Sequence, residues 1–129
     1  MNHKIHDVGV AKQIGAYSDA IEVAPNMRWF FTAGTPGLAA DGKVPPDITG
    51  QADVAWQNIM AMLKKADMGV HDLVKVTQYL LDAKDIPAYA KVRSRYLGDA
   101  RPASMLLIVP ALVWPNMLLE IEAVAAKRA

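Results

Sequence analysis

Two short segments in the last quarter of the chain decide the fold: RPASMLLIV at 101–109 and LLEIEAVA at 118–125. Both are apolar and bounded by proline or asparagine, which is typical of strands. We therefore expect two adjacent strands joined through residues 110–116. Because side chains alternate along a strand, Glu120 and Glu122 lie on one face of the sheet and the apolar residues between them on the other. One face is then core, whereas the acidic face must meet solvent, another subunit or a ligand.

The composition indicates one domain that associates with copies of itself. A chain of 129 residues is large enough to bury about two-thirds of its unfolded surface, so we expect a single domain over residues 1–129. Hydrophobic residues make up 53% and charged residues 21%, which is rich in apolar side chains for so small a protein. Part of this apolar surface is expected to be buried between subunits.

Charge and residue usage argue against several classes of function. The net charge is +1 and lysine and arginine form no block, so no nucleic-acid footprint is expected. The chain has no cysteine, and its three histidines have no acid at a useful spacing, so we expect neither a metal site nor a catalytic triad. No apolar run is as long as a membrane span, and the N-terminus lacks the apolar core of a signal peptide. We expect a cytoplasmic protein with no membrane contact.

The first part of the chain predicts short strands followed by a long loop. Residues 4–6 can form a short edge strand. The alternating segment 20–23 predicts a strand, and a hairpin turn at 24–26 is expected to lead into a second strand at 27–33. Residues 35–48 are rich in glycine and proline and predict a loop.

Two helices and a strand are predicted in the middle of the chain. Apolar residues recur at helical spacing over 52–66, which predicts a helix with Thr49 as N-cap and an end near Gly69. A strand is predicted at 73–81 and a second helix at 86–97. Each helix then connects two strands as a crossover, so both helices cover one face of a mixed, six-stranded sheet. The acidic face is left for something else, commonly another subunit.

Four segments resemble motifs of the RidA (YjgF) family. Residues 14–20 (IGAYSDA) are similar to the family's IGPYSQA, residues 31–35 (FTAGT) to FTSGQ, residues 101–104 (RPAS) to the PARS turn, and residues 120–123 (EIEA) to its EIEA strand. They occur in the family's order and spacing, and the resemblance covers nearly the whole chain.

The resemblance implies an α+β fold like that of Bacillus chorismate mutase, in a homotrimer with three small-molecule clefts at the subunit interfaces. Family members with the full motif hydrolyse reactive enamines and imines to 2-keto acids and ammonia, without a cofactor or metal. An arginine binds the substrate carboxylate, a tyrosine and backbone groups orient the substrate, and a glutamate holds the attacking water.

The chain departs from the family at the substrate anchor. The position of the family's arginine falls on Ser104 or, counting back from Glu120, on Met105, so the bidentate carboxylate clamp is missing from its usual place. The serine of FTSGQ is Ala33, and the asparagine expected on the second helix is read as Ala90. We therefore expect a divergent subgroup that acts on an enamine or imine other than the usual 2-imino acids.

These arguments define a set of candidate site residues. Glu120 is the candidate catalytic residue, as a water-positioning base. The candidate substrate-binding residues are Tyr17, Ala33, Gly34, Ser104, Met105 and Trp114.

Several alternatives stay open at this point. Glu120 fits equally well as one side of an ion pair between subunits. Arg101 or Arg93 could replace the missing arginine. The whole cleft could also belong to a non-catalytic module that binds a small metabolite or a partner protein.

Overall fold

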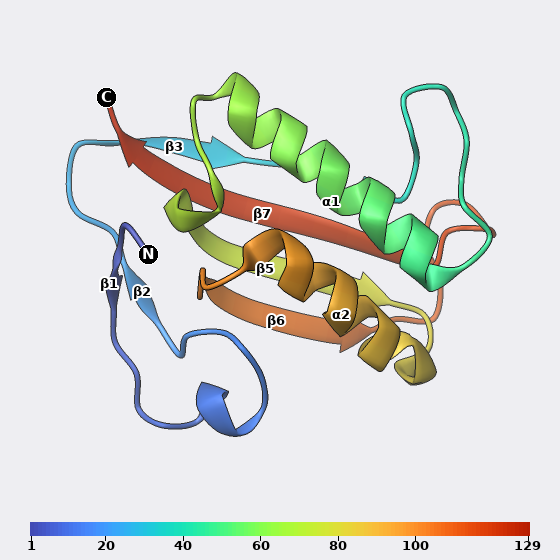
Figure 1. Cartoon of the computed structure of the whole chain (residues 1–129), viewed down its shortest axis with the longest axis horizontal. Coiled ribbons are helices and arrows are strands. Elements are labelled where there is room, and N and C mark those ends of the chain that lie inside the picture. Colours follow the sequence, from blue (N-terminus) through green and yellow to red (C-terminus); the bar gives the residue numbers. More distant parts are fainter.

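The computed structural model describes residues 1–129 as a sheet with two helices, α1 (Ile48–Lys65) and α2 (Ile86–Leu97), packed on one face (Figure 1). The main sheet contains β3 (Met27–Phe31), β4 (Thr35–Pro36), β5 (Leu73–Leu80), β6 (Ala103–Ile108) and β7 (Leu119–Arg128). Its order is β3-β7-β5-β6, and β4 also pairs with β7. The α+β class and the packing of both helices on one face are confirmed.

The strand count and one adjacency differ from the prediction. Five strands form the main sheet, while β1 (Lys4–Ile5) and β2 (Ile21–Glu22) form a separate two-stranded ribbon. The prediction that the last two strands are adjacent is wrong, because β5 lies between β6 and β7. The crossover through α2 places β6 parallel to β5 on one side, and the long connection at 109–118 returns the chain to the other side.

The predicted hairpin between residues 20–23 and 27–33 is also wrong. β2 pairs with β1, with Ile5 opposite Ile21, whereas β3 pairs with β7. Asn26 has a φ of 62° and turns the chain between the two sheets. Pairing with β7 lets Phe30 pack against the core, which a hairpin with β2 would not achieve.

The core lies between the helices and the sheet. On α1 it contains Trp56, Ile59 and Leu63, and these face buried side chains of β5 and β7 such as Val76 and Ile121. This helix is capped by other residues than predicted. The Asp47 side chain, not Thr49, accepts a hydrogen bond from the backbone of Gly50 at 2.8 Å. Its C-terminal turn uses Asp67 at a φ of 56° in place of Gly69, since short polar side chains tolerate this region.

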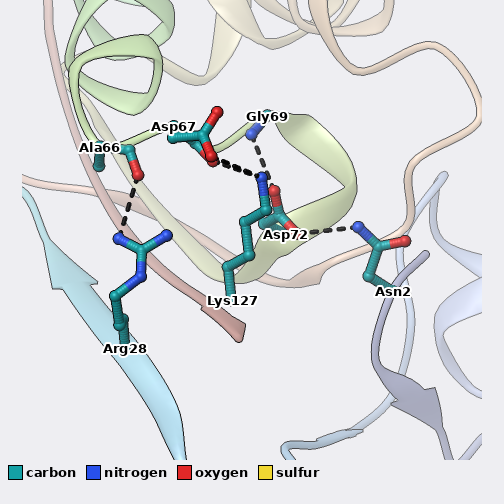
Figure 2. Close-up of polar contacts among 7 residues, drawn as sticks. All are labelled: Asn2, Arg28, Ala66, Asp67, Gly69, Asp72 and Lys127. Carbon is teal, nitrogen blue, oxygen red and sulfur yellow. Dashed lines mark hydrogen bonds and ion pairs between the residues drawn. The ribbon is translucent and has the colours of Figure 1, made fainter. Parts of the chain in front are cut away.

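Hydrogen bonds tie both chain ends to the turn after α1 (Figure 2). Lys127 of β7 donates to the Asp67 carbonyl at 2.6 Å, and Asn2 donates to the Asp72 carboxylate at 2.8 Å. Asp72 also accepts from the backbone of Gly69 at 2.9 Å. The Lys127 bond holds the end of β7 against this turn, and the Asn2 bond holds the N-terminus against Asp72. None of the helices is both long and apolar enough to cross a membrane.

Candidate functional site

A cavity of about 350 Å³ lies at the β6 edge of the sheet, between α2, β6 and segment 14–17. Its lining residues are Ile14, Gly15, Ala16, Tyr17, Gln78, Ile86, Tyr89, Ala90, Arg93, Ser94, Ser104 and Leu106. Two predicted substrate-binding residues, Tyr17 and Ser104, are thus brought together although they are far apart in the sequence. The volume is at the small end of the range for ligand sites, which suits a small metabolite.

A larger depression of about 920 Å³ lies along the outer side of α2, where residues such as Lys84, Lys91 and Arg95 line it. These side chains are exposed to solvent. None of the predicted site residues is among those that line it. The smaller cavity is therefore the better candidate site.

A buried glutamine organises the wall of the cavity. Gln78 is 1% exposed, and its amide nitrogen donates to the Ser104 hydroxyl at 3.0 Å and to the Met105 carbonyl at 2.8 Å. The Tyr89 hydroxyl donates to the Gln78 amide oxygen at 2.8 Å. Burial raises the pKa of Tyr89, so this hydroxyl stays a neutral donor. The network locks β5, β6 and α2 together beneath the cavity.

This network also decides what Ser104 can offer a ligand. Because its oxygen already accepts the Gln78 hydrogen bond, its own hydroxyl hydrogen is free to donate. Ser104 is therefore a neutral donor at the place where the family resemblance implies an arginine.

The two arginines considered as substitutes lie in different places. Arg101 donates from Nη1 to the Gly98 and Ala100 carbonyls, both at 2.9 Å, and so closes the end of α2. Arg93 lines the cavity, and its Nη1 donates to the Ala16 carbonyl at 3.3 Å. Its Nε and Nη2 are buried and have no hydrogen-bond partner in the chain. Burial lowers the pKa of Arg93, and nearby Arg101 lowers it further.

Glu120 does not line this cavity. It lies on the sheet face away from the helices. In β7 the buried residues alternate with Glu120 and Glu122, so the predicted alternation is confirmed. The Glu120 carboxylate lies against Gly34: a Cβ at that glycine would be 2.8 Å from Oε1. Gly34 thus leaves the room that this carboxylate occupies.

Glu120 and Ser104 do not meet within one chain. Ser104 pairs with Val76 of β5, and Glu120 pairs with Tyr79. The two positions are therefore two strands apart across the sheet and three residues apart along it, or about 14 Å. Ser104 also faces the helix side, where Gln78 is buried, while Glu120 faces the open side.

The open face carries an acidic pair beside exposed apolar side chains. Tyr79 donates to Glu122 at 3.2 Å. Burial raises the pKa of Tyr79, and the negative charges of Glu122 and Glu120 raise it further. Phe31 is 69% exposed, lines a shallow pocket together with Glu122, and stacks on the exposed Trp29.

The remaining predicted residues do not line the cavity. Ala33 is exposed beside Gly34. Met105, next to Ser104 in β6, is exposed on the open face opposite Thr77. Trp114 is 46% exposed in the connection between β6 and β7.

Sequence reasoning missed Gln78 as a site residue and left Arg93 as only one of two substitutes. Gln78 alternates with Val76 and Leu80 on the buried face of β5, which marks it as a polar residue that needs buried partners. Arg93 lies four residues after the buried Tyr89, so both side chains project from the same side of α2. These two spacings are the features of the sequence that could have identified Gln78 and Arg93 as site residues.

Comparison with known proteins identifies the family. The family described as Endoribonuclease L-PSP matches residues 9–127. A RutC family protein of Pyrococcus abyssi is 37% identical over 118 residues, which cover 90% of each chain. The chain therefore belongs to the endoribonuclease L-PSP family, which includes the RutC and YjgF proteins.

Solved structures agree with this assignment. YyfB of Yersinia pestis, a Rid family protein of unknown function, superposes with a TM-score of 0.84 at 24% identity, over 98% of this chain and 100% of its own; at that identity it supports the fold alone. Escherichia coli TdcF, named a putative reactive intermediate deaminase, is 26% identical over 119 residues, 90% of each chain. A TdcF structure with bound serine has a TM-score of 0.72 over 88% of this chain and 90% of its own.

Proposed function

We propose that this protein is a homotrimeric hydrolase that deaminates a small enamine or imine in clefts between its subunits. Each cleft would combine Tyr17 and Ser104 of one subunit with Gly34 and Glu120 of its neighbour. The observation that carries this proposal is the division of the predicted site between an edge cavity and the opposite sheet face. A second copy of the chain would bring the two parts together.

The exposed surface supports association. Two bulky aromatic residues, Trp29 and Phe31, stack with a centroid distance of 6.3 Å and stay exposed on the open face. β6 is the edge strand next to the cavity, and its outer side is paired only at Ala103, by a bridge to Ser18. Exposed aromatic side chains that pack together in this way are typical of a surface that another subunit covers.

The proposed reaction is the addition of water to a C=N bond. Glu120 would accept a proton from the water as its oxygen bonds to the imine carbon, and that proton would pass to the nitrogen. The C–N bond then breaks as the new hydroxyl becomes a carbonyl and its proton leaves with the nitrogen, so the products are a carbonyl compound and ammonia. An enamine substrate would first tautomerise to the imine.

The reaction class is also supported by the relatives, since TdcF carries the name of a reactive intermediate deaminase. The chain would form a divergent subgroup, because Ser104 occupies the place of the family's arginine. A specific observation favours a second candidate, a metabolite-binding module without catalysis. In a single chain, Glu120 is about 14 Å from Ser104, so the candidate base is not part of the binding cavity.

Ammonia release separates the two candidates. Freshly generated 2-aminoacrylate and a bulkier aliphatic enamine would be supplied to the natural protein and to Ser104→Arg. A deaminase releases ammonia from at least one of them faster than the spontaneous rate, and Ser104→Arg should shift the preference toward aminoacrylate. Spontaneous rates for both proteins on both substrates would leave the binding module as the better description.

A further inference from the structure

The cavity beside α2 contains a single formal charge, the guanidinium of Arg93. No aspartate or glutamate is among its lining residues. The five ion pairs of the chain do not include Arg93. A positive charge without a counter-ion therefore faces a space of about 350 Å³.

The guanidinium is also short of hydrogen-bond acceptors. Its Nη1 donates to the Ala16 carbonyl at 3.3 Å, while Nε and Nη2 have none. Buried donors without partners are costly, and those of a charged group more so. Nε and Nη2 form one side of the guanidinium fork, which matches the two oxygens of a carboxylate. The missing partner is therefore a planar anion.

Other donors lie around the same space. Ser104 has a hydroxyl hydrogen to give, because Gln78 already donates to its oxygen. The Tyr17 side chain is a further lining group that ends in a hydroxyl. The rest of the wall includes Ile14, Ile86 and Leu106, which can pack only against an apolar group. The cavity is thus cationic at one point and apolar around it.

We infer that Arg93 of α2 is the residue that binds the substrate carboxylate. The inference rests on the proposed function and names the residue that anchors its substrate. The carboxylate binds Nε and Nη2 of Arg93 and accepts from Ser104, while an aliphatic group packs against Ile86 and Leu106. An arginine from α2 thereby replaces the one that the family resemblance implies on β6.

Entry of this ligand requires a local movement. The free nitrogens of Arg93 are shielded from solvent, and segment 14–17 is held over the guanidinium by the Ala16 carbonyl. Gly15 and Ala16 are exposed and carry little or no side chain. A ligand oxygen can therefore reach the guanidinium if this segment shifts, without disturbing the buried network of Gln78.

The test measures binding of a stable 2-oxo acid, 2-oxo-4-methylpentanoate, by isothermal titration calorimetry, with its uncharged amide as the matched probe. The natural protein should bind the acid at least tenfold more tightly than the amide. Arg93→Gln should weaken binding of the acid by about 10- to 100-fold, which is the usual effect of losing a charged hydrogen-bond partner. Arg95→Gln, with the same charge change on the outer side of α2, should bind as the natural protein does.

Arg93→Lys keeps the charge but lacks the fork, so it should bind with intermediate affinity. It also provides a folded comparison if Arg93→Gln is unstable. Equal binding by the natural protein and both Arg93 variants would overturn the inference. No binding by the natural protein would overturn it too, and loss of the trimer in Arg93→Gln would then show that a neighbouring subunit's carboxylate is the partner.

This experiment is independent of turnover. A 2-oxo acid has no nitrogen to release, so its binding can depend on Arg93 even if no enamine is hydrolysed. Conversely, ammonia release that is insensitive to Arg93→Gln would support the deaminase and reject this anchor.

Discussion

The predicted site residues lie on both faces of the sheet, and the fold supports them to different degrees on the two faces. On the helix side, Ser104 is held by Gln78, which Tyr89 holds in turn, so the cavity is built within one chain. On the open side, Glu120 lies against Gly34, and the aromatic side chains of Trp29 and Phe31 are uncovered on the same face. Binding groups are thus preorganised by the fold, whereas the candidate base depends on whatever covers the open face.

The largest expected effect is a loss of catalysis without a loss of binding, when the candidate base on the open face is removed. Glu120→Gln should lower ammonia release by about 100-fold or more, because a positioned general base contributes that much to proton transfer. Binding of the 2-oxo acid and the proposed trimeric assembly should be retained. Steady-state kinetics, calorimetry and sedimentation velocity would measure the three quantities.

Glu122→Gln is the matched control, since Glu122 is on the same strand and face and accepts from Tyr79. Its rate should stay close to that of the natural protein. A full rate in Glu120→Gln would remove the catalytic role and favour an ion pair between subunits.

A smaller effect is expected from a change on the open face that touches no candidate site residue. Phe31→Asp places a charge where an apolar side chain is 69% exposed. If a second copy covers this face, desolvating the new charge should raise the dissociation constant of the trimer by about tenfold or more. Sedimentation equilibrium over a range of concentrations would show it.

Val113→Asp tests whether any exposed apolar residue gives the same result. Val113 is 80% exposed in the connection before β7, and this variant should associate normally. If Phe31→Asp remains a trimer of unchanged affinity, Phe31 is not at the interface and the proposed cleft must be built differently.

The smallest effect concerns the loop that precedes Tyr17. Asp19 accepts hydrogen bonds from the backbone of Val8 at 2.8 Å and of Ala11 at 2.8 Å, with weaker ones from Gly9 and Val10. The Val8 bond is the largest cause of the lowered pKa of Asp19, against an ordinary value of 3.8. A carboxylate with a lowered folded-state pKa stabilises the fold above its unfolded value, and this contribution is lost as the pH falls through the folded value.

The loop should therefore be ordered at pH 5 and above, and should loosen as the pH falls below about 3.8 and on through the lower folded value. Amide chemical shifts of residues 8–11 would follow the transition. Asp19→Asn should show the loosened spectrum at neutral pH, while Asp41→Asn, in a turn elsewhere, should leave these amides unchanged. Identical spectra for Asp19→Asn and the natural protein would rule out this role of the carboxylate.

Much of the secondary structure could be predicted because the signals are local. The predicted helix at 86–97 has the same bounds in the structure, because proline in the first turn and Gly98 at the end are short-range signals. The predicted faces of β5 and β7 follow from alternation alone. The ends of α1 were displaced because Asp47 and Asp67 took the roles assigned to Thr49 and Gly69.

Pairing could not be predicted in the same way. Whether residues 21–22 join β1 or β3, and which strand lies beside β6, depends on contacts between residues far apart in the chain. The choice between Arg93 and Arg101 has the same origin. Arg101 is held by two carbonyls of its own turn, whereas Arg93 faces a cavity whose other walls come from β6 and segment 14–17.

By itself the sequence determined the family, the α+β class and the alternation that puts Glu120 on the face away from the helices, since motifs and periodicity are properties of neighbouring residues. Only the tertiary structure decided that β5 separates β6 from β7 and that Ser104 and Glu120 lie on opposite faces. It also decided that the guanidinium of Arg93 has no acceptor for two of its nitrogens. These facts depend on which distant segments exclude water from one another, and that is settled only when the whole chain packs.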